Sequence, residues 1–377
     1  GLINDKEVVF VVVDGQGGVL SDHPIAIGVE ETGIDTMIDY ANNAIQPVRV
    51  DPEVNLALDT NLIDAFTHIS ENEDKERIIV ICPGRGTYTR ETSRYLKNHG
   101  APAQEQIEWM DAQRKSAELP ILTEMDTQSF KAKIHMAGEH ASPLIYACSL
   151  SDFLSIDQSK FEIVAVTGNS MGWYIALALS GAMSYENAYQ LIHTMGTMMA
   201  EGIIGGQIIY PIVDKNWQLD SEKSAMVLAE IEKAGAYVSI YLGGYLVIGG
   251  EQTVLDKLLK KLPTDDTYPF QLPYHGAFHT PLMNNISAKG MGALNTSLFQ
   301  KPVIPMVDGR GHIWTPFSTD STELHQYTLG HQVTKAYDFS SAIMVTMKEF
   351  CPDKLVLLGP GNTLGGAIGQ IMIENNW

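Results

Sequence analysis

Short, uninterrupted apolar runs that each end in a glycine-rich turn most limit what this chain can fold into. They lie at Glu7–Val13, Arg77–Cys82, Ile163–Thr167 and Lys354–Leu358, and stretches with helical periodicity follow them. A strand that is apolar on both faces has to be covered on both faces, which is typical of a parallel sheet between helices. The sequence therefore predicts an α/β fold with a mostly parallel sheet.

A second pattern interrupts this alternation between residues 205 and 273. Its segments predict strand, helix, strand, strand, helix, strand, in the order Gln207–Val213, Ser221–Ala234, Tyr237–Tyr241, Tyr245–Ile248, Gln252–Leu262 and Tyr268–Leu272. This order is the split βαβ arrangement of a ferredoxin-like domain. We predict a small domain over 205–273 inserted into a large domain formed by 76–204 and 274–377.

Composition excludes several classes of function. The chain has 25 Lys and Arg against 45 Asp and Glu, a net charge of −20, which argues against nucleic acid and against an anionic membrane surface. Three cysteines without paired spacing favour a reducing compartment, and no His, Cys, Asp and Glu cluster has metal-ligand spacing. With no 18-residue apolar run and no signal peptide, we expect a cytoplasmic protein without a bound metal.

The segment Gly168–Gly172 carries the strongest chemical signal. It reads G-N-S-M-G, follows a predicted strand and precedes the helical stretch 173–179. This is the context of a nucleophile elbow, in which the serine is exposed at a helix N-terminus. The pattern predicts an α/β-hydrolase-like large domain with Ser170 as nucleophile. The alternative is an ordinary strand–helix turn with a capping serine.

A serine nucleophile needs a base, and two histidines follow the small domain. They are His275 and His279, in a chain with eleven histidines. Composition alone does not choose among them, although His275 fits a pocket wall better than a second acid–base group. Asp14 and Asp308 are candidate carboxylates for which the sequence shows no partner. Gly15–Gly18 lacks the lysine of a phosphate-binding loop.

Three segments together resemble a known family. G-N-S-M-G at 168–172, G-A-F-H-T-P-L-M at 276–283 and L-G-P-G-N-T-L at 358–364 resemble the malonyl-CoA:acyl-carrier-protein transacylases and polyketide synthase acyltransferase domains. That family also opens with F-P-G-Q-G after a strand. Asp14–Gly17 and Cys82–Gly86 compete for this role, and the second is preferred because Arg85 lies 85 residues before Ser170. The resemblance covers 76–372 and leaves 1–75 as an N-terminal extension of unknown role.

The resemblance implies a role for each matching residue. Ser170 corresponds to the acylated nucleophile and His279 to the general base. Gln332 corresponds to the residue whose main-chain carbonyl orients that histidine. The oxyanion hole corresponds to the backbone N–H groups of Met171 and Arg85.

Departures from the family concern the substrate. Methionine stands at Met195, where the family has its malonyl-binding arginine, and Ser142 and Asn169 replace a glutamine and a histidine. One interpretation, which we prefer, is an apolar pocket for an uncharged acyl group. Met195, Ser142, Phe278 and Asn169 are its predicted substrate-binding residues, while Met198 and Met199 also fit the helix core. In the other interpretation, Arg85 points inward and binds a carboxylate.

Three functions stay open at this level. The first is an acyltransferase that moves an acyl group between thioesters of coenzyme A or acyl carrier protein through an acyl-serine, in polyketide or fatty-acid-type biosynthesis, with no bound cofactor. The second is a hydrolase of the same fold that clears stalled carrier proteins, and the third is a non-catalytic homologue that binds the carrier. An acidic carrier protein would need a local basic patch. The candidates are Lys257, Lys260 and Lys261, or Arg310 and Lys335.

Overall fold

The computed structural model describes residues 7–10, 25–28 and 75–377. Residues 1–75 and 76–377 are separate compact units. In the first unit, β1 (Glu7–Phe10) pairs antiparallel with β2 (Ile25–Gly28) in a two-stranded sheet. The expectation that this apolar run joins the main parallel sheet was therefore wrong, because an apolar run predicts a strand but not its partner. The rest of that run, and the candidate segment 14–17, lie outside the described residues.

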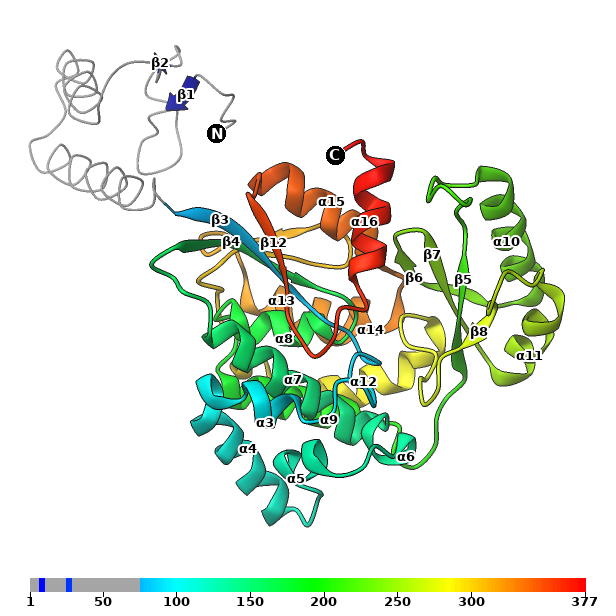
Figure 1. Ribbon diagram of the computed structural model, residues 1–377, viewed down its shortest axis with the longest axis horizontal. Coiled ribbons are helices and arrows are strands. Elements are labelled where there is room, and N and C mark those ends of the chain that lie inside the picture. Colours follow the sequence, from blue (N-terminus) through cyan, green and yellow to red (C-terminus); the bar gives the residue numbers. More distant parts are fainter. Residues whose placement is uncertain (1–6, 11–24, 29–74) are drawn as a thin grey trace, which may run out of the picture. The chain divides into compact units, whose positions relative to one another are not determined.

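The second unit is built on a five-stranded sheet (Figure 1). Its order is β10 (Ile313–Trp314), β9 (Met306–Val307), β4 (Phe161–Gly168), β3 (Glu76–Cys82) and β12 (Lys354–Leu357). Neighbouring strands run parallel except β10, which is antiparallel to β9. The predicted mostly parallel sheet is confirmed. β9 and β10 have two residues each, too few for their apolar pattern to be recognised in the sequence.

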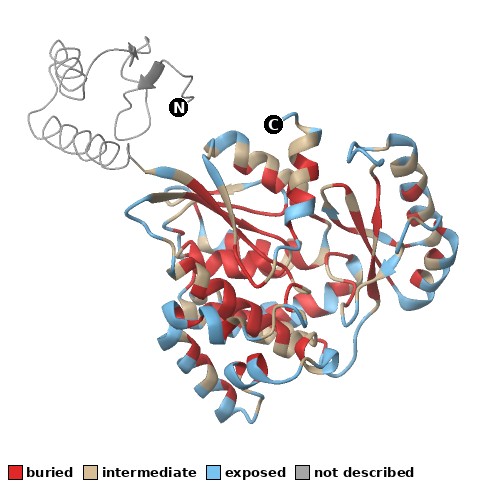
Figure 2. Cartoon of the chain, viewed as in Figure 1, coloured by how far each residue is buried: buried red, intermediate tan, exposed pale blue. Residues whose placement is uncertain are grey.

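Helices cover both faces of this sheet. Figure 1 shows α15 (Phe339–Phe350) and α16 (Gly365–Glu374) on one side and α7 (Gly138–Leu154), α8 (Gly172–Leu179) and α9 (Tyr185–Thr197) on the other. The buried residues concentrate in the sheet and in α7 and α8 (Figure 2). β3 is fully buried from Ile79 to Cys82, which is why its sequence is a continuous apolar run.

Further helices belong to this unit. They are α3 (Tyr95–His99), α4 (Gln104–Ser116), α5 (Leu122–Thr127), α6 (Ala132–His135), α12 (Asn284–Ala293), α13 (Ser321–Gln326) and α14 (Gln332–Thr334). Single 3₁₀ turns lie at Ala101–Ala103, Pro281–Met283 and Thr296–Leu298. A π-helix, Tyr327–His331, connects α13 to α14.

A second sheet has the order β11-β6-β7-β5-β8. Its strands are β5 (Gly206–Pro211), β6 (Tyr237–Leu242), β7 (Tyr245–Gly250), β8 (Phe270–Gln271) and β11 (Tyr337–Asp338). With α10 (Ser221–Ala234) and α11 (Gln252–Lys261), the first four give the predicted ferredoxin-like order of elements. The fifth strand, β11, was not predicted and pairs parallel with β6. The exact domain boundaries stay a prediction.

None of the helices in the described ranges is long and apolar enough to span a bilayer.

Candidate active site

Ser170 lies in the tight turn between β4 and α8. Its φ is +56°, in the left-handed region that residues other than glycine rarely adopt. A Cβ at Gly168 would lie 2.5 Å from the carbonyl carbon of Gly172, and one at Gly172 would lie 2.3 Å from the carbonyl oxygen of Cys82. The two glycines of G-N-S-M-G are therefore required by close packing, and they leave Ser170 projecting from the turn.

The histidine that Ser170 meets is His279. The Oγ of Ser170 lies 2.7 Å from His279 Nε2, and His279 Nδ1 lies 2.5 Å from the main-chain oxygen of Gln332. Because that carbonyl only accepts, Nδ1 carries the proton and Nε2 is left free to accept the serine proton. The structure thus brings together the three residues that the sequence singled out. His275 also lines the cavity, but its Nδ1 pairs with Gln207 Oε1 at 3.0 Å.

Burial controls the charge of His279. Its side chain is enclosed by protein, and desolvation lowers its pKa to about 4, against a smaller opposing effect of the hydrogen bond to Gln332. The imidazole is therefore neutral near pH 7, which is the state of a general base. Burial and the nearby Arg85 charge also hold the pKa of His275 well below its usual range.

Gln332 is itself fixed by its side chain. Its Nε2 donates to the main-chain oxygen of Ser170 at 3.0 Å, and its Oε1 accepts from the hydroxyl of Tyr174 at 3.1 Å. These bonds connect the serine turn to the carbonyl that orients His279. No pattern in the sequence pointed to Tyr174, which reads as one more apolar residue of α8.

The two predicted oxyanion-hole residues lie in neighbouring turns. Met171 precedes the first residue of α8, and Arg85 follows β3, whose last residue pairs in register with Gly168. A Cβ at Gly84 would lie 2.9 Å from the carbonyl oxygen of Asn169, so this glycine permits the close approach of the turns. Met171 and Arg85 both line the cavity into which Ser170 opens.

That cavity has a volume of about 350 Å³. All four predicted substrate-binding residues, Met195, Ser142, Phe278 and Asn169, line it together with Ser170 and His279. The sequence did not anticipate the wall that the second sheet provides. That wall includes Gln207, Ile209, Ile240, Leu242 and Val247. The cavity is therefore mainly apolar.

Arg85 is the single charged side chain among the cavity-lining residues of the described chain. Its Nη2 donates to the carbonyl oxygens of Met136 at 2.9 Å and Tyr274 at 2.7 Å, while its buried Nε has no hydrogen-bond partner. Burial lowers its pKa to about 10, so the guanidinium stays protonated at neutral pH. Among the described residues that line it, the cavity thus has one positive charge and no carboxylate.

Residues of both predicted basic patches form ion pairs with acidic side chains. Lys261 of α11 lies 3.5 Å from Glu230, and a docking role for Lys257, Lys260 and Lys261 stays a prediction. Asp308, for which the sequence showed no partner, is fully buried and forms an ion pair with Arg310 at 2.6 Å. The turn after β9 folds the arginine back onto the carboxylate, and a docking role for Arg310 and Lys335 stays a prediction. In the described ranges, no group of three His, Cys, Asp or Glu is placed to hold a metal.

A serine on a strand–helix turn, paired with a histidine anchored through its other nitrogen, is the geometry of an enzyme that forms an acyl-serine. No family model matches the chain. Among curated proteins it is 25% identical over 238 residues to a polyketide biosynthesis malonyl CoA-acyl carrier protein transacylase of Bacillus subtilis, covering 62% of this chain and 78% of that protein. It is 23% identical over 301 residues to a malonyl CoA-acyl carrier protein transacylase of Staphylococcus aureus, covering 78% and 91%.

Solved structures show the same fold. A malonyl-CoA:acyl carrier protein transacylase of Xanthomonas oryzae gives a TM-score of 0.65 at 20% identity, covering 79% of this chain and 92% of that one. The acyltransferase domain from the second module of the salinomycin polyketide synthase gives 0.62 at 19% identity, covering 79% and 67%. The homologues and structural neighbours of this chain are thus transacylases and polyketide synthase acyltransferase domains. The predicted resemblance to these proteins is confirmed.

Proposed function

We propose that this enzyme moves an acyl group from one thioester to another thiol through an ester on Ser170. The observation that carries the proposal is the 2.7 Å contact between Ser170 Oγ and the neutral Nε2 of His279. Its relatives are named for coenzyme A and acyl carrier protein, so we propose a coenzyme A thioester as donor and the phosphopantetheine thiol of a carrier protein as acceptor.

Each proton and bond in this cycle has a place. His279 Nε2 takes the proton as Ser170 Oγ attacks the thioester carbonyl, and the resulting oxyanion faces the N–H groups of Met171 and Arg85. The C–S bond then breaks, and the imidazolium returns its proton to the departing sulfur. The acceptor thiol repeats these steps in reverse, so that its acyl thioester forms and Ser170 is restored. The carbonyl of Gln332 holds the imidazole throughout.

We further propose that the acyl group carries no carboxylate. Met195 is buried in the cavity wall at the position that corresponds to the malonyl-binding arginine, and a thioether does not compensate a carboxylate. The Arg85 guanidinium is already engaged by two main-chain carbonyls.

One observation favours a second candidate, an acyl group that ends in a carboxylate. Arg85 places a positive charge in the cavity wall without any carboxylate among the lining residues, and an anionic acyl group would compensate it. The hydrolase uses the same serine and histidine, and differs only in that water attacks the acyl-serine.

A transfer assay separates these candidates. The enzyme is given acetyl, longer-chain or malonyl coenzyme A, and the mass of an added acyl carrier protein is followed, with Arg85→Met and Met195→Arg as variants. We expect acetyl or longer chains on the carrier, with little effect of Arg85→Met and a gain of malonyl transfer in Met195→Arg. Malonyl transfer that Arg85→Met abolishes would establish the second candidate instead. Free acid released in place of acyl carrier protein would establish the hydrolase.

A further inference from the structure

The residue that orients His279 follows directly on an irregular helix. Gln332 comes after the π-helix Tyr327–His331, and its N–H donates to the carbonyl oxygen of Tyr327, five residues back. A π-turn holds one residue more than an α-turn, so it rotates the carbonyls that follow relative to a regular helix. Where the Gln332 carbonyl points therefore depends on how this turn is held.

Tyr327, the first residue of the π-helix, is held from several sides. Its hydroxyl accepts the N–H of Gly309 at 2.9 Å. The guanidinium of Arg310 lies 4.2 Å from the centre of its ring, and the ring of Trp173 meets it edge-on at 5.3 Å. A cation over an aromatic face and an edge-to-face pair both favour one ring orientation.

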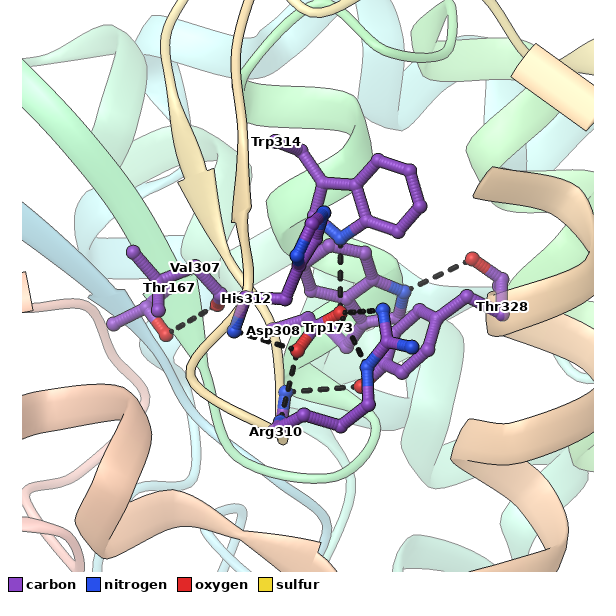
Figure 3. A network of polar contacts seen from close by, with 10 residues as sticks. Thr167, Trp173, Val307, Asp308, Arg310, His312, Trp314 and Thr328 are labelled. Carbon is purple, nitrogen blue, oxygen red and sulfur yellow. Dashed lines mark hydrogen bonds and ion pairs between the residues drawn. The ribbon is translucent and has the colours of Figure 1, made fainter. Parts of the chain in front are cut away.

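Arg310 is in turn fixed by the buried carboxylate of Asp308 (Figure 3). Oδ2 of Asp308 accepts from Arg310 Nη2 at 2.6 Å, from Arg310 Nε at 3.1 Å and from Trp314 Nε1 at 3.0 Å. Oδ1 accepts the main-chain N–H groups of Arg310 and His312. A buried charge is costly unless it is fully paired, and this one has five donors. The turn after β9, which contacts Tyr327 through Gly309 and Arg310, is therefore held in one conformation.

A side-chain hydrogen bond also joins the π-helix to α8, the helix that follows Ser170. Trp173, three residues after Ser170 and fully buried, donates from Nε1 to Oγ1 of Thr328 at 3.0 Å (Figure 3). Ser287 of α12 donates to the Leu329 carbonyl at 2.6 Å. The turn after β9, the π-helix and the turn that carries Ser170 are thus connected by one network of contacts.

We infer that Asp308, Arg310 and Tyr327 are positioning residues that hold the π-turn so that the Gln332 carbonyl faces Nδ1 of His279. Their effect on the reaction rests on the proposed function, whereas their effect on the His279 hydrogen bond does not. If the carbonyl moves away, His279 is free to adopt the other tautomer, with the proton on Nε2. That tautomer has no lone pair with which to accept the Ser170 proton.

The test uses Asp308→Asn and Tyr327→Phe in the full chain. Its first readout is the proton resonance of His279 Nδ1–H in histidine-labelled protein, assigned by its loss in His279→Gln. A short hydrogen bond moves such a resonance far downfield, so we expect an upfield shift or loss in both variants. The second readout is the acylation of Ser170. We expect its rate constant to fall about 10- to 100-fold, less than the full contribution of a general base, with KM changed less than about twofold.

Asp126→Asn is the matched control. Asp126 is also a buried carboxylate of the same unit, and it accepts from the Tyr88 hydroxyl at 2.8 Å. We expect this variant to lower Tm while it keeps the His279 resonance and the acylation rate. Tyr327→Phe removes a single oxygen, so it carries the test if Asp308→Asn does not fold.

Variants of Asp308 and Tyr327 that lower Tm like the control but keep the resonance and the rate would overturn the inference. A chain that never acylates Ser170 would refute the proposed function instead, and the resonance would still decide the positioning role.

Discussion

At the scale of single residues, the site depends on a histidine kept neutral by burial. Among the described residues, no carboxylate is hydrogen-bonded to His279. Its Nδ1–H donates to a main-chain oxygen, which favours the protonated ring less than an ionised aspartate would. Desolvation therefore dominates, and the pKa of His279 falls to about 4. His279 therefore stays unprotonated, and can act as a base, down to a lower pH than an ordinary histidine.

This predicts the pH dependence of acylation. A lowered pKa means that His279 takes up its proton only near pH 4, so the rate constant for Ser170 acylation should stay level from about pH 8 to 5 and fall below that. Stopped-flow or quenched-flow acylation with an uncharged acyl thioester measures it. A decline centred near pH 6.5, the ordinary value for histidine, would show that the site is open to water.

The residues predicted from the sequence are those with a motif around them. Ser170 follows from a glycine turn between a strand and a helix, and His279 and Gln332 follow from the family resemblance. Tyr174 and the carbonyls that hold Arg85 carry no such signal, because a hydrogen bond between distant segments depends on how those segments pack.

At the scale of elements, the turn between β4 and α8 is the most constrained part of the unit. Gly172 allows α8 to begin against the end of β3, where a Cβ would lie 2.3 Å from the main-chain oxygen of Cys82. The atom it would meet is backbone, which does not move aside at low cost.

Gly172→Ala should therefore lower the free energy of unfolding by about 1–3 kcal/mol and reduce acylation more than its stability loss explains. Gly292→Ala, in α12 where a Cβ meets nothing within 4 Å, should be neutral or stabilise by up to about 1 kcal/mol. Urea unfolding measures the stability of the two variants, and their acylation rate constants are measured alongside. Equal behaviour of the two variants would refute the packing argument.

Elements differ in how far the sequence predicts them. Long apolar runs predicted β3, β4 and β12 close to their observed ends, and the order of the elements from β5 to β8 was also predicted correctly. The two-residue strands β9, β10 and β11 are too short for a pattern. The π-helix has no distinct periodicity, since its irregular turn is imposed by its neighbours.

At the scale of the whole 76–377 unit, the cavity belongs to neither sheet alone. Turns after β3 and β4 supply Arg85 and Ser170, the segment after β8 supplies His279, and strands of the second sheet supply the opposite wall. β11 follows the π-helix and α14 in the chain and precedes α15. It adds a fifth strand to the second sheet. This shared construction brings residues that are far apart in the sequence to one cavity.

Every step proposed for this enzyme passes through an acyl group on Ser170, which intact-protein mass spectrometry detects. The enzyme is mixed with acetyl, longer-chain and malonyl coenzyme A without acceptor, beside Ser170→Ala. We predict one acyl mass per chain, located to the peptide that contains Ser170, removed by a thiol acceptor and absent in Ser170→Ala. An adduct that persists in Ser170→Ala, or the absence of any adduct from all donors, would show that Ser170 does not carry the acyl group.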